Sequence, residues 1–367
     1  MNTPLLTILQ GDALSKLKEL PSESVHMCCT SPPYFRLRQY GVEGQIGLEK
    51  TPEEYVANLV AVFREVRRVL RKDGTLWVNL GDSYAGSWGN YGEGYRPAAS
   101  HKLQGIKPKD LIGIPWLVAF ALRADGWWLR SEITWCKTVP MPESVLDRPT
   151  SATEKIFLLT KSAKYWYDAE AVRNPPSESF LNDSRWKTGL TPENEKNKKG
   201  YADAGAQNPK QVHRMFDKQR GWHGGGKQMP GDGQKTFGEG RGNYGLRSQL
   251  TDKQRGHSRR HAGFNDRWDQ MTKEEQMRFG SNMRNYWVLG PEPFKGDHFA
   301  TFPTEVPCKC ILAGCPIGGT VLDPFAGSGT TGQVALELGR KAVLIELNPA
   351  YIELIHQRTN VTPGLPL

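Results

Sequence analysis

Apolar residues along this chain recur in two patterns, short runs that are typical of buried strands and stripes that are typical of amphipathic helices. The runs predict strands at 5–10, 25–30, 75–80, 127–136, 155–160, 321–323 and 342–346. The stripes predict helices at 13–20, 51–72, 110–124, 330–339 and 349–358. Because strands and helices alternate, we expect an α/β fold with a doubly wound, mostly parallel sheet that is covered on both faces.

The clearest helix start is Thr51, which can cap the helix, with Pro52 in the first turn and Glu54 three residues on. The apolar stripe of this helix comprises Tyr55, Leu59, Val62, Phe63, Val66, Val69 and Leu70. The turn residues at 73–74 then predict that the helix continues to about Lys72 and that a new strand follows them.

Net charge separates residues 175–285 from the rest of the chain. The whole chain carries +9, and this segment holds 21 Lys and Arg against 13 Asp and Glu, so nearly all of the excess lies here. The segment also has 16 of the 39 glycines and no sustained period. We therefore expect a loop-rich, partly disordered insert. Its charge indicates either a polyanion partner or a solvated insert whose charge aids solubility.

Composition disfavours several classes of protein and site. No apolar run reaches the roughly 20 residues that a membrane-spanning helix needs. The N-terminus lacks the basic start and apolar core of a signal peptide, so we expect a cytoplasmic protein without a membrane partner. Six cysteines in 367 residues do not form a disulfide scaffold. The spacing of Cys308, Cys310 and Cys315 is not a zinc motif, so we expect no metal site.

A glycine-rich loop follows the strand at 321–323. Residues 327–332 match the pattern GxGxxG, in which glycines let a ligand approach the backbone ahead of a helix N-terminus. Glu346, at the end of the next strand, is placed to hold ribose hydroxyls. The motif alone also fits a nicotinamide dinucleotide, and thus an oxidoreductase. Asp323 favours a zwitterionic ligand, because its carboxylate would repel a pyrophosphate and can accept from an ammonium group.

The run at 323–331, Asp-Pro-Phe-Ala-Gly-Ser-Gly-Thr-Thr, resembles the S-adenosylmethionine loop of the DNA amino-methyltransferases. The resemblance implies that one set of residues lines the methionine end of this cofactor: Asp323, Phe325, Gly327, Ser328, Gly329 and Thr330. It further implies that Glu346 holds the ribose, with Asn348 close by.

Two other segments are similar to cofactor contacts of the same family. Residues 299–304, which include Phe302 and Pro303, look like the segment that the family places against the cofactor just before the loop. Asp12, after Gly11, looks like the adenine-side contact. Asp12 is equally well placed to cap the helix that follows it, and the two roles are compatible.

A second motif, Ser-Pro-Pro-Tyr, ends the strand at 25–30 and resembles the catalytic motif of this family. The catalytic residues that it implies are Ser31, Pro32, Pro33 and Tyr34. A base amine is a poor nucleophile, because its lone pair is delocalised into the ring. The Ser31 hydroxyl and the Pro32 carbonyl can accept from both N–H groups and favour the pyramidal amine. Tyr34 can stack on the ring of a base that has flipped out of the duplex.

The form of the second motif bears on the target base. Ser in the first position is similar to the cytosine-N4 enzymes, whereas the adenine-N6 enzymes usually begin with Asp or Asn. Cys29 departs from this signature, which more often has an aliphatic residue there. Methylation at cytosine C5 needs a thiolate nucleophile. Although Pro307 precedes Cys308, no Glu-Asn-Val partner is present, so we interpret Cys308 as structural.

The order of the motifs is similar to the β group of the family, a permuted version of the Rossmann-like methyltransferase fold. We expect a catalytic half at 1–174, a DNA-reading insert at 175–285 and a cofactor-binding half at 286–367. Double-stranded DNA is the implied partner. A cognate restriction endonuclease and a homodimer are left open, and so is a non-catalytic DNA-binding protein on the same fold.

Trp135 and Lys137 lie near the end of one predicted strand. They either contact the target base or backbone, or belong to an edge strand from which the lysine reaches solvent. We favour the edge strand.

Overall fold

The computed structural model describes residues 4–85, 105–175, 272, 275, 280–290, 292 and 302–361. The chain divides into two compact units, one of Met1–Asn174 with Asn282–Leu367 and one of Pro175–Ser281. The first unit holds the sheet and both motifs. The predictions of disorder and of DNA contacts for the basic insert concern residues that lie almost wholly outside the described ranges.

In the described part of the chain, eight strands form one sheet in the order β1-β8-β7-β2-β3-β5-β4-β6. The strands are β1 (Leu6–Gln10), β2 (Val25–Thr30), β3 (Leu70–Leu80), β4 (Trp128–Lys137), β5 (Thr153–Thr160), β6 (Tyr286–Leu289), β7 (Thr320–Asp323) and β8 (Lys341–Glu346). Neighbours are parallel except where β5 pairs with β3 and with β4. The predicted mostly parallel α/β sheet is confirmed. The carboxyl-terminal strands β8 and β7 lie between the amino-terminal strands β1 and β2.

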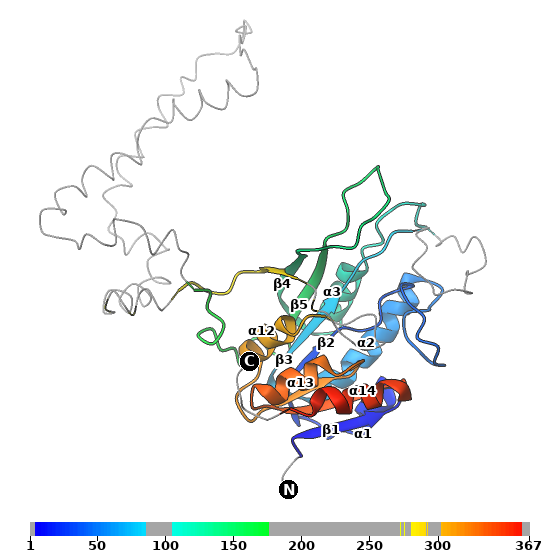
Figure 1. Ribbon diagram of the computed structural model, residues 1–367. Helices are drawn as coiled ribbons and strands as arrows, with labels where there is room; N and C mark the ends of the chain where they lie inside the picture. The colour runs from blue at the N-terminus through cyan, green and yellow to red at the C-terminus, as the bar shows by residue number, and fades with distance from the viewer. Residues whose placement is uncertain are drawn as a thin grey trace, which may run out of the picture. The chain divides into compact units, whose positions relative to one another are not determined.

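Helices cover both faces of the sheet (Figure 1). They are α1 (Ala13–Glu19), α2 (Pro52–Val69), α3 (Ile114–Ala124), α12 (Glu305–Gly314), α13 (Thr330–Glu337) and α14 (Pro349–Thr359). One apolar core joins the sheet to the first three helices through side chains such as Leu17 and Phe63. The other core joins it to the last three through side chains such as Ile311 and Val334. The two-sided arrangement leaves the ends of the strands as the places where a ligand can enter.

The junction of α2 and β3 differs from the prediction that the helix continues to Lys72. The helix ends at Val69, and Leu70 has extended backbone angles of φ −67° and ψ 140°. Leu70 pairs with Val25 of β2, so the pairing of strands takes over where helix periodicity alone would continue. Gly74 then lies inside β3, where a Cβ would be 3.0 Å from the carbonyl oxygen of Arg71.

The strand β6 was not predicted, and it changes the interpretation of β4. It pairs in parallel with β4, which therefore lies between β5 and β6 and is not an edge strand. Trp135 is buried, and its indole N–H donates to the carbonyl of Leu289 at 3.3 Å. Lys137 Nζ lies 2.5 Å from the Glu154 carboxylate. The edge-strand interpretation is wrong: Trp135 is buried, and the partly exposed Lys137 is paired with Glu154.

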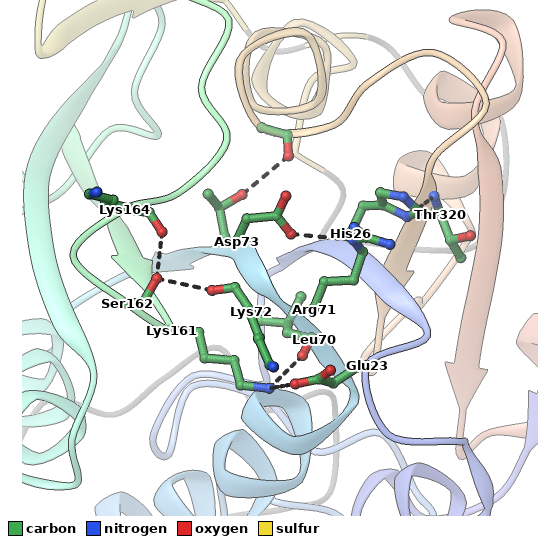
Figure 2. Close-up of polar contacts among 12 residues, drawn as sticks. Glu23, His26, Leu70, Arg71, Lys72, Asp73, Lys161, Ser162, Lys164 and Thr320 are labelled. Atoms are coloured by element: carbon green, nitrogen blue, oxygen red, sulfur yellow. Dashed lines mark hydrogen bonds and ion pairs between the residues drawn. The ribbon is translucent and has the colours of Figure 1, made fainter.

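Polar contacts between neighbouring elements close the amino-terminal edge of the sheet (Figure 2). The Lys161 ammonium donates to the carbonyl of Leu70 at 2.7 Å and lies 3.5 Å from the Glu23 carboxylate. His26 Nδ1 accepts from the backbone N–H of Thr320 at 3.0 Å, which joins β2 to β7. Burial lowers the pKa of His26, so the ring stays neutral and able to accept at neutral pH. These contacts tie four strands together at the edge opposite the two motifs.

Candidate active site

The carboxyl ends of β1, β2, β7 and β8 meet around one cavity. Gly11 follows β1, Ser31 follows β2, Pro324 follows β7 and Leu347 follows β8, and all four line this cavity. The carboxyl edge of a parallel sheet is where ligands bind in open α/β folds. The permuted order of the chain therefore brings the two motifs, nearly 300 residues apart, to one place.

Most of the residues that the motifs single out lie on the wall of this cavity: Asp12, Ser31, Pro33, Phe302, Phe325, Gly327, Ser328, Thr330, Glu346 and Asn348. The others do not line it: Pro32, Tyr34, Pro303, Asp323 and Gly329. Pro32 is buried, and Pro303 precedes α12, where its carbonyl accepts from the N–H of Val306. The cavity thus combines a Ser-Pro-Pro segment with the glycine loop.

Asp323 has a structural place in the site. Its carboxylate is 2% exposed and accepts from the Thr30 hydroxyl at 2.6 Å, the Thr331 hydroxyl at 2.7 Å and the Phe325 N–H at 3.0 Å. Burial raises the pKa of Asp323, although these three bonds oppose the rise. The group bonds inward and does not line the cavity, so its contact with an ammonium group stays a prediction. It joins the end of β2 to the loop after β7.

Glu346 is the carboxylate that does face the cavity. Its two oxygens accept from the N–H groups of Gly327 at 2.7 Å and Asn348 at 2.8 Å. Burial raises its pKa to about 6. Each carboxylate oxygen has a second lone pair, so the group can still accept from hydroxyls of a ligand. This geometry suits the predicted ribose contact.

The predicted N-cap role of Asp12 is confirmed, and its adenine-side contact stays a prediction. Asp12 is the N-cap of α1, where its Oδ1 accepts from the N–H of Ser15 at 2.8 Å, and it also lines the cavity. The preceding Gly11 has φ 142°, and its N–H donates to the carbonyl of Glu346 at 2.9 Å. The β1–α1 turn is thereby fixed against the end of β8.

Left-handed glycines shape the loop that precedes α13. Gly327 has φ 54° and Gly329 has φ 86°. Gly329 stands at the N-cap of α13, and a Cβ there would lie 3.2 Å from Ile355 of α14. The Ser328 hydroxyl accepts from Arg358 at 2.6 Å, which anchors the loop to α14 as well. The backbone therefore approaches the cavity where side chains would otherwise stand.

The Ser-Pro-Pro-Tyr loop is held from two sides. The Pro33 carbonyl accepts from the Tyr55 hydroxyl of α2 at 2.8 Å. The Tyr34 hydroxyl donates to Glu154 at 2.5 Å, and its ring lies so close to Gly81 that a Cβ there would be 2.5 Å away. The predicted stacking of Tyr34 on a base stays a prediction.

Sequence reasoning missed one wall of the cavity. Residues 40–46 supply Tyr40, Gln45 and Ile46, and Tyr351 of α14 adds a further aromatic ring. No motif marks this loop. The sequence marks this loop only by the closely spaced glycines Gly41, Gly44 and Gly47. In the structure their φ angles are 72°, 81° and 103°.

The cysteines of the described residues carry no visible chemistry. Cys28 and Cys29 are buried in β2, and burial raises the pKa of the Cys308 thiol in α12, as expected of a structural residue. No group of three or more candidate metal ligands occurs among the residues that the structure describes. In the same ranges, no helix is long and apolar enough to cross a membrane.

Comparison with known proteins decides the family. Residues 25–357 match the N6_N4_Mtase family, which is described as DNA methylase. The chain belongs to this family. This DNA methylase is 38% identical over 363 residues to the Type II methyltransferase M.Cfr9I of Citrobacter freundii, a match covering 96% of this chain and 87% of that protein. It is 36% identical over 361 residues to M.SmaI of Serratia marcescens, with coverage of 96% and 89%.

Two solved structures share the fold of this DNA methylase. The PvuII DNA methyltransferase, titled cytosine-N4-specific, has a TM-score of 0.54 at 16% identity and covers 98% of this chain and 89% of its own. TTHA0409 from Thermus thermophilus, solved with S-adenosyl-L-methionine, has a TM-score of 0.51 at 21% identity, with coverage of 98% and 95%. Relatives this distant establish the fold alone.

The sequence predicts S-adenosylmethionine as the cofactor, and the TTHA0409 structure was solved with this molecule. The residues of the cavity fit it. The carboxylates of Glu346 and Asp12 can accept from hydroxyl and amino groups, and the rings of Tyr40 and Phe302 offer apolar faces to a purine. The glycine loop admits a ligand close to its backbone.

Proposed function

We propose that this DNA methylase transfers a methyl group to N4 of cytosine at a specific site in double-stranded DNA. The main support for the proposal is the position of Ser31. It stands at the end of β2, lines the cofactor cavity, and begins a Ser-Pro-Pro-Tyr motif that resembles the cytosine-N4 enzymes. The flipped base would reach the cavity from the side of this loop.

The chemistry needs acceptors for the amine of the target base. The bound cofactor supplies a methyl group on a sulfonium. The Ser31 hydroxyl and the Pro32 carbonyl would accept from the two N–H groups, so that the lone pair of the amine is freed for attack. The bond from Tyr55 to the next carbonyl, that of Pro33, keeps the loop rigid. Pre-set acceptors of this kind lower the barrier without reorganising during the reaction.

Adenine N6 is the second candidate target within the same reaction class. One stretch of 81 residues is 41% identical to a protein of Escherichia coli named DNA adenine methyltransferase YhdJ, and it covers 21% of this chain. Ser31 favours cytosine, because the adenine enzymes usually place Asp or Asn there.

The proposal extends to the basic insert and to biological partners. Residues 175–285 would bind phosphates and read the target site through Arg, Asn and Gln side chains.

A cognate restriction endonuclease would recognise the same site, which suits the Type II names of the relatives. We also propose that the enzyme works in the cytoplasm, where DNA is accessible, and that it can pair as a homodimer.

Transfer of a labelled methyl group to DNA, followed by separation of the nucleosides, tests the proposal. We expect label in N4-methylcytosine from the wild-type chain and almost none from Ser31→Ala. Label in N6-methyladenine would replace the base assignment. No transfer by the folded wild-type chain would leave the non-catalytic DNA-binding alternative.

A further inference from the structure

A largely buried polar network adjoins the catalytic loop, and none of its members except Ser31 lines the cofactor cavity. It consists of Glu154 on β5, Asn79 on β3, Lys137 on β4 and Tyr34, and it reaches Ser31. The Glu154 side chain is 12% exposed. No sequence motif marks Glu154, and the reaction outlined above does not use it.

Hydrogen-bond directions in this network follow from Glu154. An ionised carboxylate only accepts. Tyr34 therefore donates its single proton to Glu154 Oε2 at 2.5 Å. Burial and the adjacent carboxylate raise the pKa of Tyr34 well above its usual value, so the phenol keeps that proton. With its proton committed, the Tyr34 oxygen can only accept from Ser31, whose hydroxyl lies 3.3 Å away.

The amide of Asn79 is directed by the same carboxylate. Its Nδ2 donates to Glu154 Oε2 at 2.8 Å and to the Tyr34 hydroxyl at 2.8 Å. Its Oδ1 is buried and has no hydrogen-bond partner among the described residues. Turning the amide would place this oxygen against the carboxylate, which repels it. Fixing Asn79 Nδ2 as a donor to Glu154 therefore leaves Asn79 Oδ1 without a hydrogen bond, which is unfavourable for a buried oxygen.

Lys137 holds the Glu154 carboxylate in place. Its Nζ lies 2.5 Å from Glu154 Oε1, the oxygen that Tyr34 and Asn79 do not use. Both oxygens of Glu154 are therefore occupied, and the side chain has one orientation. Charge-assisted bonds of this kind are stronger than neutral ones.

We propose that Glu154 is a positioning residue for methyl transfer: it fixes, through Tyr34, the direction of the Ser31 hydroxyl. With its proton directed to Tyr34, Ser31 Oγ can only accept its other hydrogen bonds; one comes from Asn79 Nδ2 at 3.5 Å, and a second lone pair remains for a group in the cavity that Ser31 lines. A lone pair there can accept from the amine of the target base, and a proton there could not. This inference rests on the proposed role of Ser31 and holds for either target base.

The chain offers a matched control. Glu132 and Lys155 form an ion pair of 2.6 Å between the same two strands, β4 and β5. Glu132→Gln and Glu154→Gln therefore make the same chemical change in the same pair of strands. Only Glu154 reaches Ser31.

The test compares single-turnover methyl transfer to DNA for the wild type, E154Q, E132Q, Y34F and E154Q/Y34F, with cofactor affinity and Tm measured for each. In E154Q the amide can donate to Tyr34, which turns the Tyr34 proton toward Ser31. We expect the transfer rate to fall by about 10- to 100-fold, the loss that a misdirected hydrogen bond produces. Cofactor Kd should change less than about twofold, as in E132Q.

Coupling within the network separates a positioning role from a structural one. Since Glu154 acts through the Tyr34 hydroxyl, E154Q/Y34F should be no slower than the slower single variant. A rate for E154Q equal to that of E132Q, or multiplicative losses in the double variant, would overturn the inference while the proposed function stands. Full activity of Ser31→Ala would overturn both.

Discussion

At the scale of single residues, two carboxylates at similar places in the sequence differ in their hydrogen bonds and in their access to the cavity. Asp323 and Glu346 end the neighbouring strands β7 and β8 beside the glycine loop. Asp323 takes three bonds from the protein and is sealed from the cavity. Glu346 takes backbone bonds and keeps one face on the cavity. Glu346 is therefore placed for the predicted ribose contact, and Asp323 joins the end of β2 to the loop after β7.

The raised pKa of Glu346, about 6, predicts a pH dependence. A carboxyl that holds its proton more tightly when folded makes the free energy of unfolding fall as pH rises from about 4.5 to about 6. Binding that needs the ionised form has the opposite trend. We expect cofactor affinity, measured by calorimetry, to be flat above pH 7 and to weaken as pH falls through 6.

Glu346→Gln provides the control for this dependence. It should bind the cofactor more weakly at pH 8 and should not weaken further between pH 7 and pH 5. An unchanged pH profile in this variant would assign the titration to another group.

At the scale of elements, the start of α13 depends on backbone that only glycine adopts readily. Gly329→Ala combines a positive φ with a Cβ 3.2 Å from Ile355, so we expect a loss of about 2–3 kcal/mol in the free energy of unfolding and weaker cofactor binding. Urea denaturation and calorimetry measure the two effects.

Gly318→Ala is the matched control, because Gly318 has φ 74° and nothing within 4 Å of a Cβ. We expect it to cost about 1 kcal/mol, from backbone strain alone, and to leave cofactor binding unchanged. Equal effects of the two changes would mean that the packing of the loop on α14 is unimportant.

The bounds of an element could be predicted from sequence where the residues of that element alone determine them. The β2 bounds, 25–30, were predicted as observed, because a buried run stops at prolines. Prediction failed where partners distant in sequence decide. Leu70 belongs to an apolar stripe and a strand alike, and only its pairing with Val25 makes it extended. The four residues of β6 become a strand by pairing with β4.

The candidate site shows the same division. Local motifs predicted most of the cavity wall, including Ser31 and Glu346. Glu154 could not be predicted, because its role arises from the side-by-side placement of β3, β4 and β5. The inward turn of Asp323 likewise depends on Thr30, 293 positions away in the sequence.

At the scale of the whole molecule, charge and catalysis occupy different parts of the chain. Nearly all of the net charge of +9 lies in 175–285, whereas the motifs and the cavity belong to the unit that holds the sheet. We expect affinity for non-target DNA to fall steeply with salt, since phosphate contacts release counterions. Neutralising Arg255, Arg259 and Arg260 should lower the slope of log K against log salt by about 2–3.

Neutralisation of three cations elsewhere is the control for charge alone. Arg71, Lys72 and Lys164 lie at the amino-terminal edge of the sheet, and their replacement by Gln should leave the slope nearly unchanged. A flat salt response of the wild type would mean that the insert does not hold DNA.

The central claim is that one enzyme methylates cytosine N4 at a specific DNA site, and mapping modified bases across a genome that expresses the chain tests it most directly. We predict N4-methylcytosine within a single short sequence context, and its absence when Ser31→Ala is expressed at the same level. N6-methyladenine at a defined site, or no modified base above the level of the Ser31→Ala cells, would contradict the claim.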